Sequence, residues 1–159
     1  MRLPLAVLAT LLGAPTWAQD LAPLDPGASI AFFGVHFIDT SAEGAINGVR
    51  PDETARLALL EEEVRQRFLD EGFTLVDLAP VAEELARTRN PADCNGCELR
   101  MAAELGADYA LVGEVQKVSN LILAMNLALS EVDSERLVRM LAVDIRGGTV
   151  EVVPNNAAA

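Results

Sequence analysis

Lysine and histidine are almost missing from this chain of 159 residues: Lys117 is the only lysine and His36 the only histidine. Acidic residues outnumber basic ones 24 to 12, which gives a net charge of −12. Binding to nucleic acid or to anionic lipid head groups requires clustered basic side chains, so the composition argues against both partners. A lone histidine without a nucleophile-elbow glycine pattern also argues against a Ser-His-Asp catalytic site.

Hydrophobic runs long enough to span a membrane, which takes about 20 apolar residues, are also lacking. The apolar run at residues 3–13 is too short for this, follows Arg2, and precedes Thr16-Trp17-Ala18. This pattern predicts a signal peptide at residues 1–18 that is cleaved after Ala18. We therefore expect a secreted, periplasmic protein without stable membrane insertion after cleavage. The residue directly after the predicted cleavage point is Gln19 and not a lipobox cysteine, which argues against a lipid anchor.

The remaining chain has the length of one domain and alternates between strand and helix patterns. Residues 19–28 predict a flexible lead-in, residues 29–149 a single α/β (α+β) domain, and residues 150–159 a short irregular tail. The element order is β-α-β-α-α-β-β-β, with a loop at residues 40–50. It predicts a mixed sheet with helices packed on it and a C-terminal antiparallel hairpin that turns at residues 133–136. The predicted elements are strands at 29–38, 73–77, 109–115, 121–132 and 137–145, and helices at 51–71, 80–87 and 97–105.

Cys94 and Cys97 are the only cysteines, separated by Asn95-Gly96. A structural disulfide is the favoured interpretation, because two thiols this close pair in an oxidising compartment. A thiol–disulfide oxidoreductase site is the alternative, since Cys97 begins a predicted helix. However, the preceding segment is a polar loop, and Glu98 beside the thiols would raise their pKa. A haem or zinc site is disfavoured, because residue 98 is not histidine and His36 is the only histidine available. No cofactor, metal or catalytic residue is therefore expected.

Five polar residues near two strand ends are candidate contacts for a ligand or partner. Lys117, Ser119 and Asn120 occupy a predicted connection between strands, where Lys117 would attract a carboxylate ligand or neutralise Asp144. The alternative is a polar connection in which Ser119 and Asn120 cap backbone groups. Asp144 and Arg146 lie on one face of a single predicted strand and could pair directly.

Several strings resemble a family of small secreted proteobacterial proteins grouped as a domain of unknown function. More distantly, the pattern is similar to the amino-terminal domain of TolB and to CsgG-like and LpoB-like periplasmic domains. That similarity implies an α/β domain used for protein contacts in the cell envelope and not for catalysis. The segments that carry the family resemblance are residues 38–77, 94–97, 105–108, 112–113, 117–123 and 144–147.

The C-terminal segment departs from the family pattern. After Thr149 the resemblance implies a terminal helix with a tryptophan, whereas this chain continues as Val150-Glu151-Val152-Val153-Pro154. We therefore expect one sheet face to lack a cover, and an envelope protein or a second copy of the chain to supply it.

The favoured function is a non-catalytic binding or assembly module of the cell envelope. The alternatives are a periplasmic thiol–disulfide oxidoreductase that uses Cys94 and Cys97, and a small-ligand sensor that uses the loop at residues 40–50 with Lys117.

Overall fold

The computed structural model describes residues 23–146 and 149–153 of the chain. The predicted signal peptide lies outside these residues. The chain contains two short 3₁₀ turns, η1 (Ala79–Val81), which leads into the third α-helix, and η2 (Pro91–Asp93), which precedes the fourth. The other elements, in chain order, are β1 (Ser29–Asp39), α1 (Ala42–Asn47), α2 (Pro51–Asp70), β2 (Thr74–Leu75), α3 (Ala82–Arg87), α4 (Cys97–Glu104), β3 (Tyr109–Ser119), β4 (Ile122–Glu131), β5 (Arg136–Arg146) and β6 (Thr149–Val153).

The strands form one mixed sheet in the order β2-β1-β3-β4-β5-β6. β1 runs parallel to β2 and β3, because helical segments cross over between them. β3 to β6 run antiparallel to their neighbours, and the turn between β4 and β5 lies where the sequence predicts it. The predicted fold class, with a mixed sheet, packed helices and a C-terminal hairpin, is confirmed.

Two elements differ from the sequence prediction. The segment at residues 40–50, predicted as a loop, contains α1, whose first turn is capped by the Ser41 hydroxyl accepting from the Gly44 N–H. The segment from residue 150, predicted as an irregular tail, contributes to β6, which pairs with β5. Both elements are six residues or fewer, too short for a periodic pattern to reveal.

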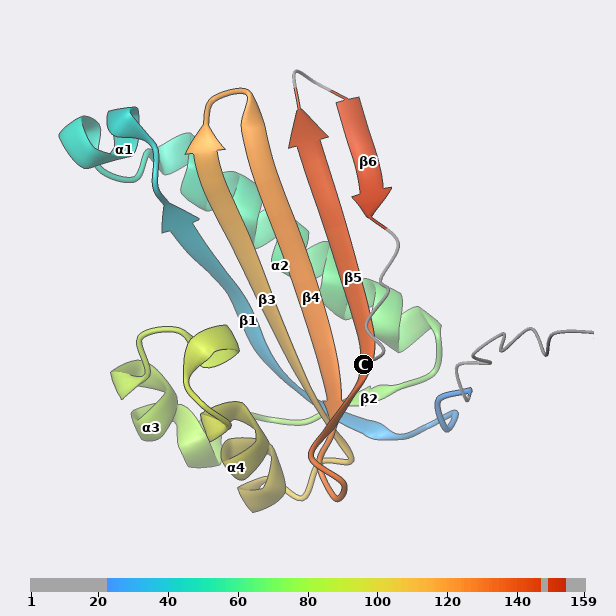
Figure 1. Ribbon diagram of the computed structural model, residues 1–159. Helices are drawn as coiled ribbons and strands as arrows, with labels where there is room; N and C mark the ends of the chain where they lie inside the picture. Colours follow the sequence, from blue (N-terminus) through green and yellow to red (C-terminus); the bar gives the residue numbers. More distant parts are fainter. Residues whose placement is uncertain (1–22, 147–148, 154–159) are drawn as a thin grey trace, which may run out of the picture.

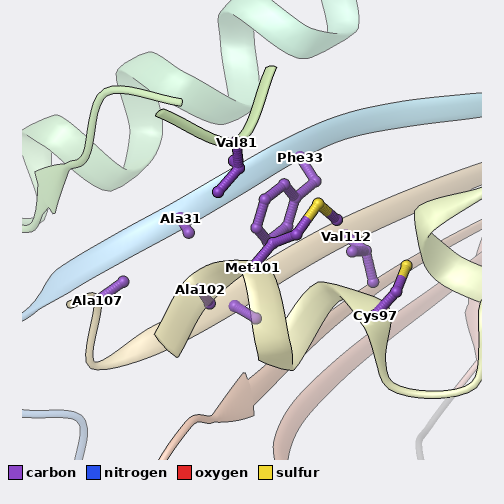
Figure 2. Packing of buried hydrophobic residues seen from close by; sticks show 9 residues of the cluster. Ala31, Phe33, Val81, Cys97, Met101, Ala102, Ala107 and Val112 are labelled. Atoms are coloured by element: carbon purple, nitrogen blue, oxygen red, sulfur yellow. The ribbon is translucent and has the colours of Figure 1, made fainter. Parts of the chain in front are cut away.

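Helices cover the two faces of the sheet unequally (Figure 1). α2 crosses one face, and its predicted apolar stripe packs there: Val64 is buried among Phe32, Leu111 and Leu129 from the strands. On the other face, α3 and α4 lie against one half of the sheet only. Figure 2 shows this second core, where Met101 of α4 packs beside Phe33, Val112 and Val81. Within the described residues, no helix combines the length and apolar character needed to cross a membrane.

Candidate functional site

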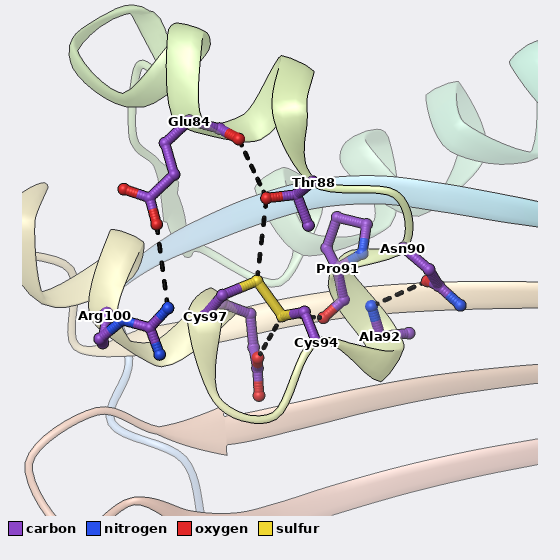
Figure 3. Close-up of a disulfide and its surroundings, with 9 residues drawn as sticks. Glu84, Thr88, Asn90, Pro91, Ala92, Cys94, Cys97 and Arg100 are labelled. Atoms are coloured by element: carbon purple, nitrogen blue, oxygen red, sulfur yellow. Dashed lines mark hydrogen bonds and ion pairs between the residues drawn. A yellow bond between two sulfur atoms is a disulfide. The ribbon is translucent and has the colours of Figure 1, made fainter.

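Cys94 and Cys97 form a disulfide, as the favoured interpretation of the sequence predicts (Figure 3). Gly96 precedes α4 in the left-handed region with φ 85°, so the loop closes tightly before Cys97 enters the helix. Cys97 is 5% exposed and belongs to the core beneath α4, while Cys94 is half-buried. The bridge therefore joins the preceding loop to the first turn of α4.

The surroundings of this bridge are acidic and do not favour thiol chemistry. Oε2 of Glu98 lies 3.2 Å from Sγ of Cys94, and the carbonyl of Pro91 lies 3.3 Å from the same sulfur. A nearby negative charge disfavours the thiolate that nucleophilic attack requires. The two sulfurs of Cys94 and Cys97 and a carboxylate oxygen of Glu98 also lie close enough together to hold a metal ion. However, sulfurs bonded to each other are not the thiolates that bind one.

Lys117 lies inside β3 and not in a connection between strands. The residue is 3% exposed, and its ammonium contacts three carboxylates. The Nζ atom lies 2.5 Å from Oε1 of Glu53, 3.5 Å from Oδ2 of Asp39 and 3.7 Å from Oε2 of Glu43. These acids come from the first turn of α2, the end of β1 and α1, so one cation ties three elements to β3.

Contacts within this charge cluster shift the pKa values of Glu53, Lys117 and Asp39. Donation from Lys117 lowers the pKa of Glu53, and the Glu53 carboxylate in turn raises the pKa of Lys117. The Ser41 hydroxyl, and after it the charge of Lys117, lowers the pKa of Asp39. The ammonium is therefore fully engaged with internal carboxylates, which makes it an unfavourable place for an organic acid to bind.

The other predicted contact residues lie near the same end of the sheet. Ser119 follows the capping alternative, because its hydroxyl accepts from the Leu121 N–H at 3.2 Å. Asn120 is exposed in the turn that follows it. Asp144 and Arg146 pair directly at 3.0 Å, as the sequence predicts. The prediction that Lys117 neutralises Asp144 is wrong, since Lys117 pairs with Asp39, Glu43 and Glu53.

Lys117 and Asp144 lie on opposite faces of the sheet. Lys117 points to α2, and its neighbour Gln116 therefore points to the other face. Gln116 pairs across the strands with Ala124, and Ala124 pairs with Asp144. Gln116, Ala124 and Asp144 thus form one row across three strands, near the end of β3. At that end, α3 and α4 leave the sheet uncovered (Figure 1).

We call this region the open sheet face. It combines small, branched apolar and hydrogen-bonding side chains, most of them half-buried by their neighbours. Pairing across the four strands assigns to it His36 and Ile38 of β1, Glu114 and Gln116 of β3, Ile122, Ala124 and Asn126 of β4, and Ala142, Asp144 and Arg146 of β5. Sequence alternation showed which residues share a face, but it could not show where the covering helices end.

Two hollows occur elsewhere on the described part of the chain. One, of about 610 Å³, lies at the opposite end of the sheet and is lined by acidic groups that include Asp25, Asp108 and Glu131. Asp108 is already held there by the backbone N–H and hydroxyl of Ser29, which lower its pKa. The other is an apolar groove of about 470 Å³ between α2 and strands β4 and β5.

The fold is similar to that of solved LpoB domains and of a lipoprotein. The C-terminal domain of LpoB from Salmonella enterica superposes with a TM-score of 0.51 at 18% identity, covering 79% of this chain and 87% of that domain. Lipoprotein GNA1162 from Neisseria meningitidis gives a TM-score of 0.52 at 17% identity, covering 77% of this chain and 82% of that one. At these identities the likeness concerns the fold alone, and it confirms the LpoB-like architecture expected from the sequence.

A family model supports the same grouping at the level of sequence. No protein of curated function matches the chain. The DUF3280 model, described as "Protein of unknown function (DUF2380)", matches residues 28–154. The domain-of-unknown-function resemblance stated from the sequence is thereby confirmed, and the chain belongs to this family.

Proposed function

We propose that the protein is a non-catalytic binding or assembly module of the cell envelope, which docks a protein partner on the open sheet face. The observation that carries this proposal is the half of one sheet face that no described helix covers (Figure 1). Elsewhere on the same face, Met101, Ala102 and Val112 are buried in one core, so the open part is a distinct surface. The fold likeness to the LpoB domain and to lipoprotein GNA1162 supports the proposal.

The chemistry of the open sheet face suits a protein better than a small ligand. The two hollows described above are lined by other residues of the described part of the chain. Ala124 and Ala142 allow close approach, while Gln116 and Asn126 offer hydrogen bonds at the centre. With a net charge of −12, the chain will associate fastest with a partner whose contact surface is basic.

Periplasmic location is part of the proposal. It is supported by the predicted signal peptide and by the disulfide, which is stable in an oxidising compartment. Mass spectrometry of the exported protein should show a chain that begins at Gln19 with both sulfurs oxidised. Recovery of the full-length chain from the cytosol with two free thiols would contradict this part.

Site-specific photo-crosslinking tests the partner surface. A photoreactive residue at Ala124, in the centre of the open sheet face, should trap one discrete protein in living cells. The matched control is Leu59, an exposed residue of α2 (71% exposed), where the same adduct should be absent. Ala142→Arg should abolish the Ala124 adduct by blocking the face. Identical adducts from both positions, or an adduct that survives the arginine, would overturn the docking surface.

A further inference from the structure

The apolar groove on the α2 side of the sheet is a second unassigned surface. Its floor comes from β4 and β5, and its wall from one flank of α2. The apolar side chains that line it are Leu24, Leu60, Val64, Phe68, Leu111, Met125, Leu127, Leu129, Met140 and Leu141. A volume of about 470 Å³ falls within the range of small-molecule pockets, about 300–1,000 Å³.

The groove exists because α2 covers only part of its face. The helix packs mainly on β1 and β2, and Val64 reaches Leu111 of β3 and Leu129 of β4. It leaves the rest of β4 and β5 partly uncovered beside it. Leu141, which faces Leu127 across the two strands, remains 40% exposed as a result. Removing apolar surface of this kind from water is favourable, so a bound apolar ligand would be stabilised here.

Basic groups stand at one end of the groove. Arg139 lies opposite Leu129 near the start of β5, and its Nη1 already donates to the Val138 carbonyl at 2.7 Å. A guanidinium carries several N–H donors, so it can also donate to a ligand. Arg67 lies in the last turn of α2, which ends at the same end of the sheet because the chain returns there into β2 beside the start of β1. Glu63, one turn earlier on α2, is the acidic residue of the lining. The charged side chains of the groove thus lie at one end, and the rest of its floor is apolar.

We propose that this groove binds a single-chain amphiphile of the fatty-acid class. The alkyl chain lies along Leu127 and Leu141, and the carboxylate contacts Arg67 and Arg139. Guanidinium groups bind carboxylates by donating paired hydrogen bonds. A ligand with an ammonium head group has no acceptor atom for these bonds. Arg67 already pairs with Glu71 at 2.8 Å on the exposed surface, and such a pair exchanges readily. This binding site lies on the other side of the sheet from the proposed partner surface and does not depend on it.

Calorimetry with the mature full chain tests the proposal, using dodecanoate below its micelle concentration as the probe. Each buried methylene should raise affinity about fourfold, so decanoate should bind about 15-fold more weakly than dodecanoate. Dodecyltrimethylammonium carries the same chain with a cationic head and should bind at least about tenfold more weakly. Equal affinities for the two head groups would show unspecific detergent binding and overturn the proposal.

Two leucines of β5 provide a matched pair of variants. Leu141 lines the groove and Leu137 does not, although their exposures are similar at 40% and 47%. Leu141→Asp should abolish dodecanoate binding, whereas Leu137→Asp should leave it unchanged. If the aspartate variant does not fold, Leu141→Gln replaces it. The same loss in both leucine variants would contradict the site.

The arginines are tested in the same way. Arg67→Gln/Arg139→Gln should weaken dodecanoate at least about tenfold and leave dodecyl maltoside unaffected. The control, Arg136→Gln/Arg146→Gln, removes the same charge from exposed positions of β5 outside the groove and should change neither. A concentration-dependent dimer that excludes dodecanoate would identify the groove as a contact between copies and would overturn the fatty-acid proposal.

Discussion

The ammonium of Lys117 lies 2.5 Å from the carboxylate of Glu53, although 64 residues separate them in the chain. Lys117 lies near the end of β3 and Glu53 in the first turn of α2, so the contact sets how that helix begins over the strands. Asp39 and Glu43 approach the same ammonium from β1 and α1. Because Lys117 is the only lysine of the chain, no other lysine can replace it.

Replacing Lys117 by methionine should lower the melting temperature by about 10 °C or more. Methionine has a similar length, so the main change is that three clustered carboxylates lose their cation. Thermal unfolding followed by circular dichroism measures the effect. The control is Arg146→Met, which breaks the more exposed pair with Asp144 and should shift the melting temperature by less than about 4 °C. Equal shifts in both variants would show that the buried cluster contributes little.

The same cluster should make stability fall in acid. The pKa values of Asp39 and Glu53 lie below their ordinary values in the folded protein, so these groups release protons more readily folded than unfolded. Their contribution is therefore complete above the unfolded values, near pH 4, and is lost as the pH falls through the folded ones. The pKa of Lys117 is raised, so its contribution is complete below its unfolded value and is lost only in strong alkali.

Melting temperatures between pH 7 and pH 2 measure this dependence. Glu53→Gln removes one of the titrating groups, and its melting temperature should be lower at pH 7 but fall less steeply between about pH 5 and pH 2. The exposed Glu62→Gln is the control and should keep the parent slope. A Glu53→Gln curve that runs parallel to the parent would contradict the assignment of the pH dependence to this cluster.

Local patterns in the sequence predicted most of the fold. The spacing of Leu57, Leu60, Val64 and Phe68 identifies α2, and alternation along residues 121–132 identifies β4, because both signals come from neighbouring residues. The short α1 and β6 have no such period. Their formation depends on a serine cap and on pairing with β5, respectively.

The candidate sites depend on contacts that sequence spacing does not contain. Lys117 looked like a loop cation near Asp144, because its true partners come from three distant segments. The pairing of Cys94 with Cys97, by contrast, is a local event and was predicted. Which parts of the sheet stay open depends on where α2, α3 and α4 end over the strands. That is a property of three-dimensional packing and not of alternation.

The carboxylate of Glu61, on α2, should stabilise the register shift in β1. The register with β3 shifts between Phe32 and Val35, and Gly34 adopts φ 85° there. Oε1 of Glu61 accepts the Val35 N–H at 2.7 Å, on the edge of β1 that β2 does not reach. Glu61→Ala should lower the free energy of unfolding by about 1.5 kcal/mol, the usual contribution of a hydrogen bond to a charged group.

Urea denaturation compares this variant with Glu62→Ala, which removes the neighbouring exposed glutamate. The control should change stability by less than about 0.5 kcal/mol. Hydrogen exchange at the Val35 amide gives a local measurement, since that amide should exchange faster only in Glu61→Ala. A slowly exchanging Val35 amide in this variant would mean that another group protects it.

The Cys94–Cys97 bridge should act locally. It closes a loop of only four residues, so the chain-entropy model gives it about 2 kcal/mol of stability. Cys94→Ser/Cys97→Ser should lower the free energy of unfolding by that amount. Amide hydrogen exchange should become faster at the end of η2 and in the first turn of α4, which the bridge joins. It should stay unchanged in β4 and β5, which the bridge does not join.

The same variant separates a structural bridge from a redox site. A structural bridge predicts that the parent protein fails to reduce insulin and that reducing the bridge with a phosphine lowers its stability as much as the double substitution does. The acidic side chain of Glu98 at 3.2 Å from Cys94 is the reason to expect this, because it disfavours the thiolate that a redox enzyme needs. Turnover of insulin by the parent, lost in the double variant, would establish the redox function instead.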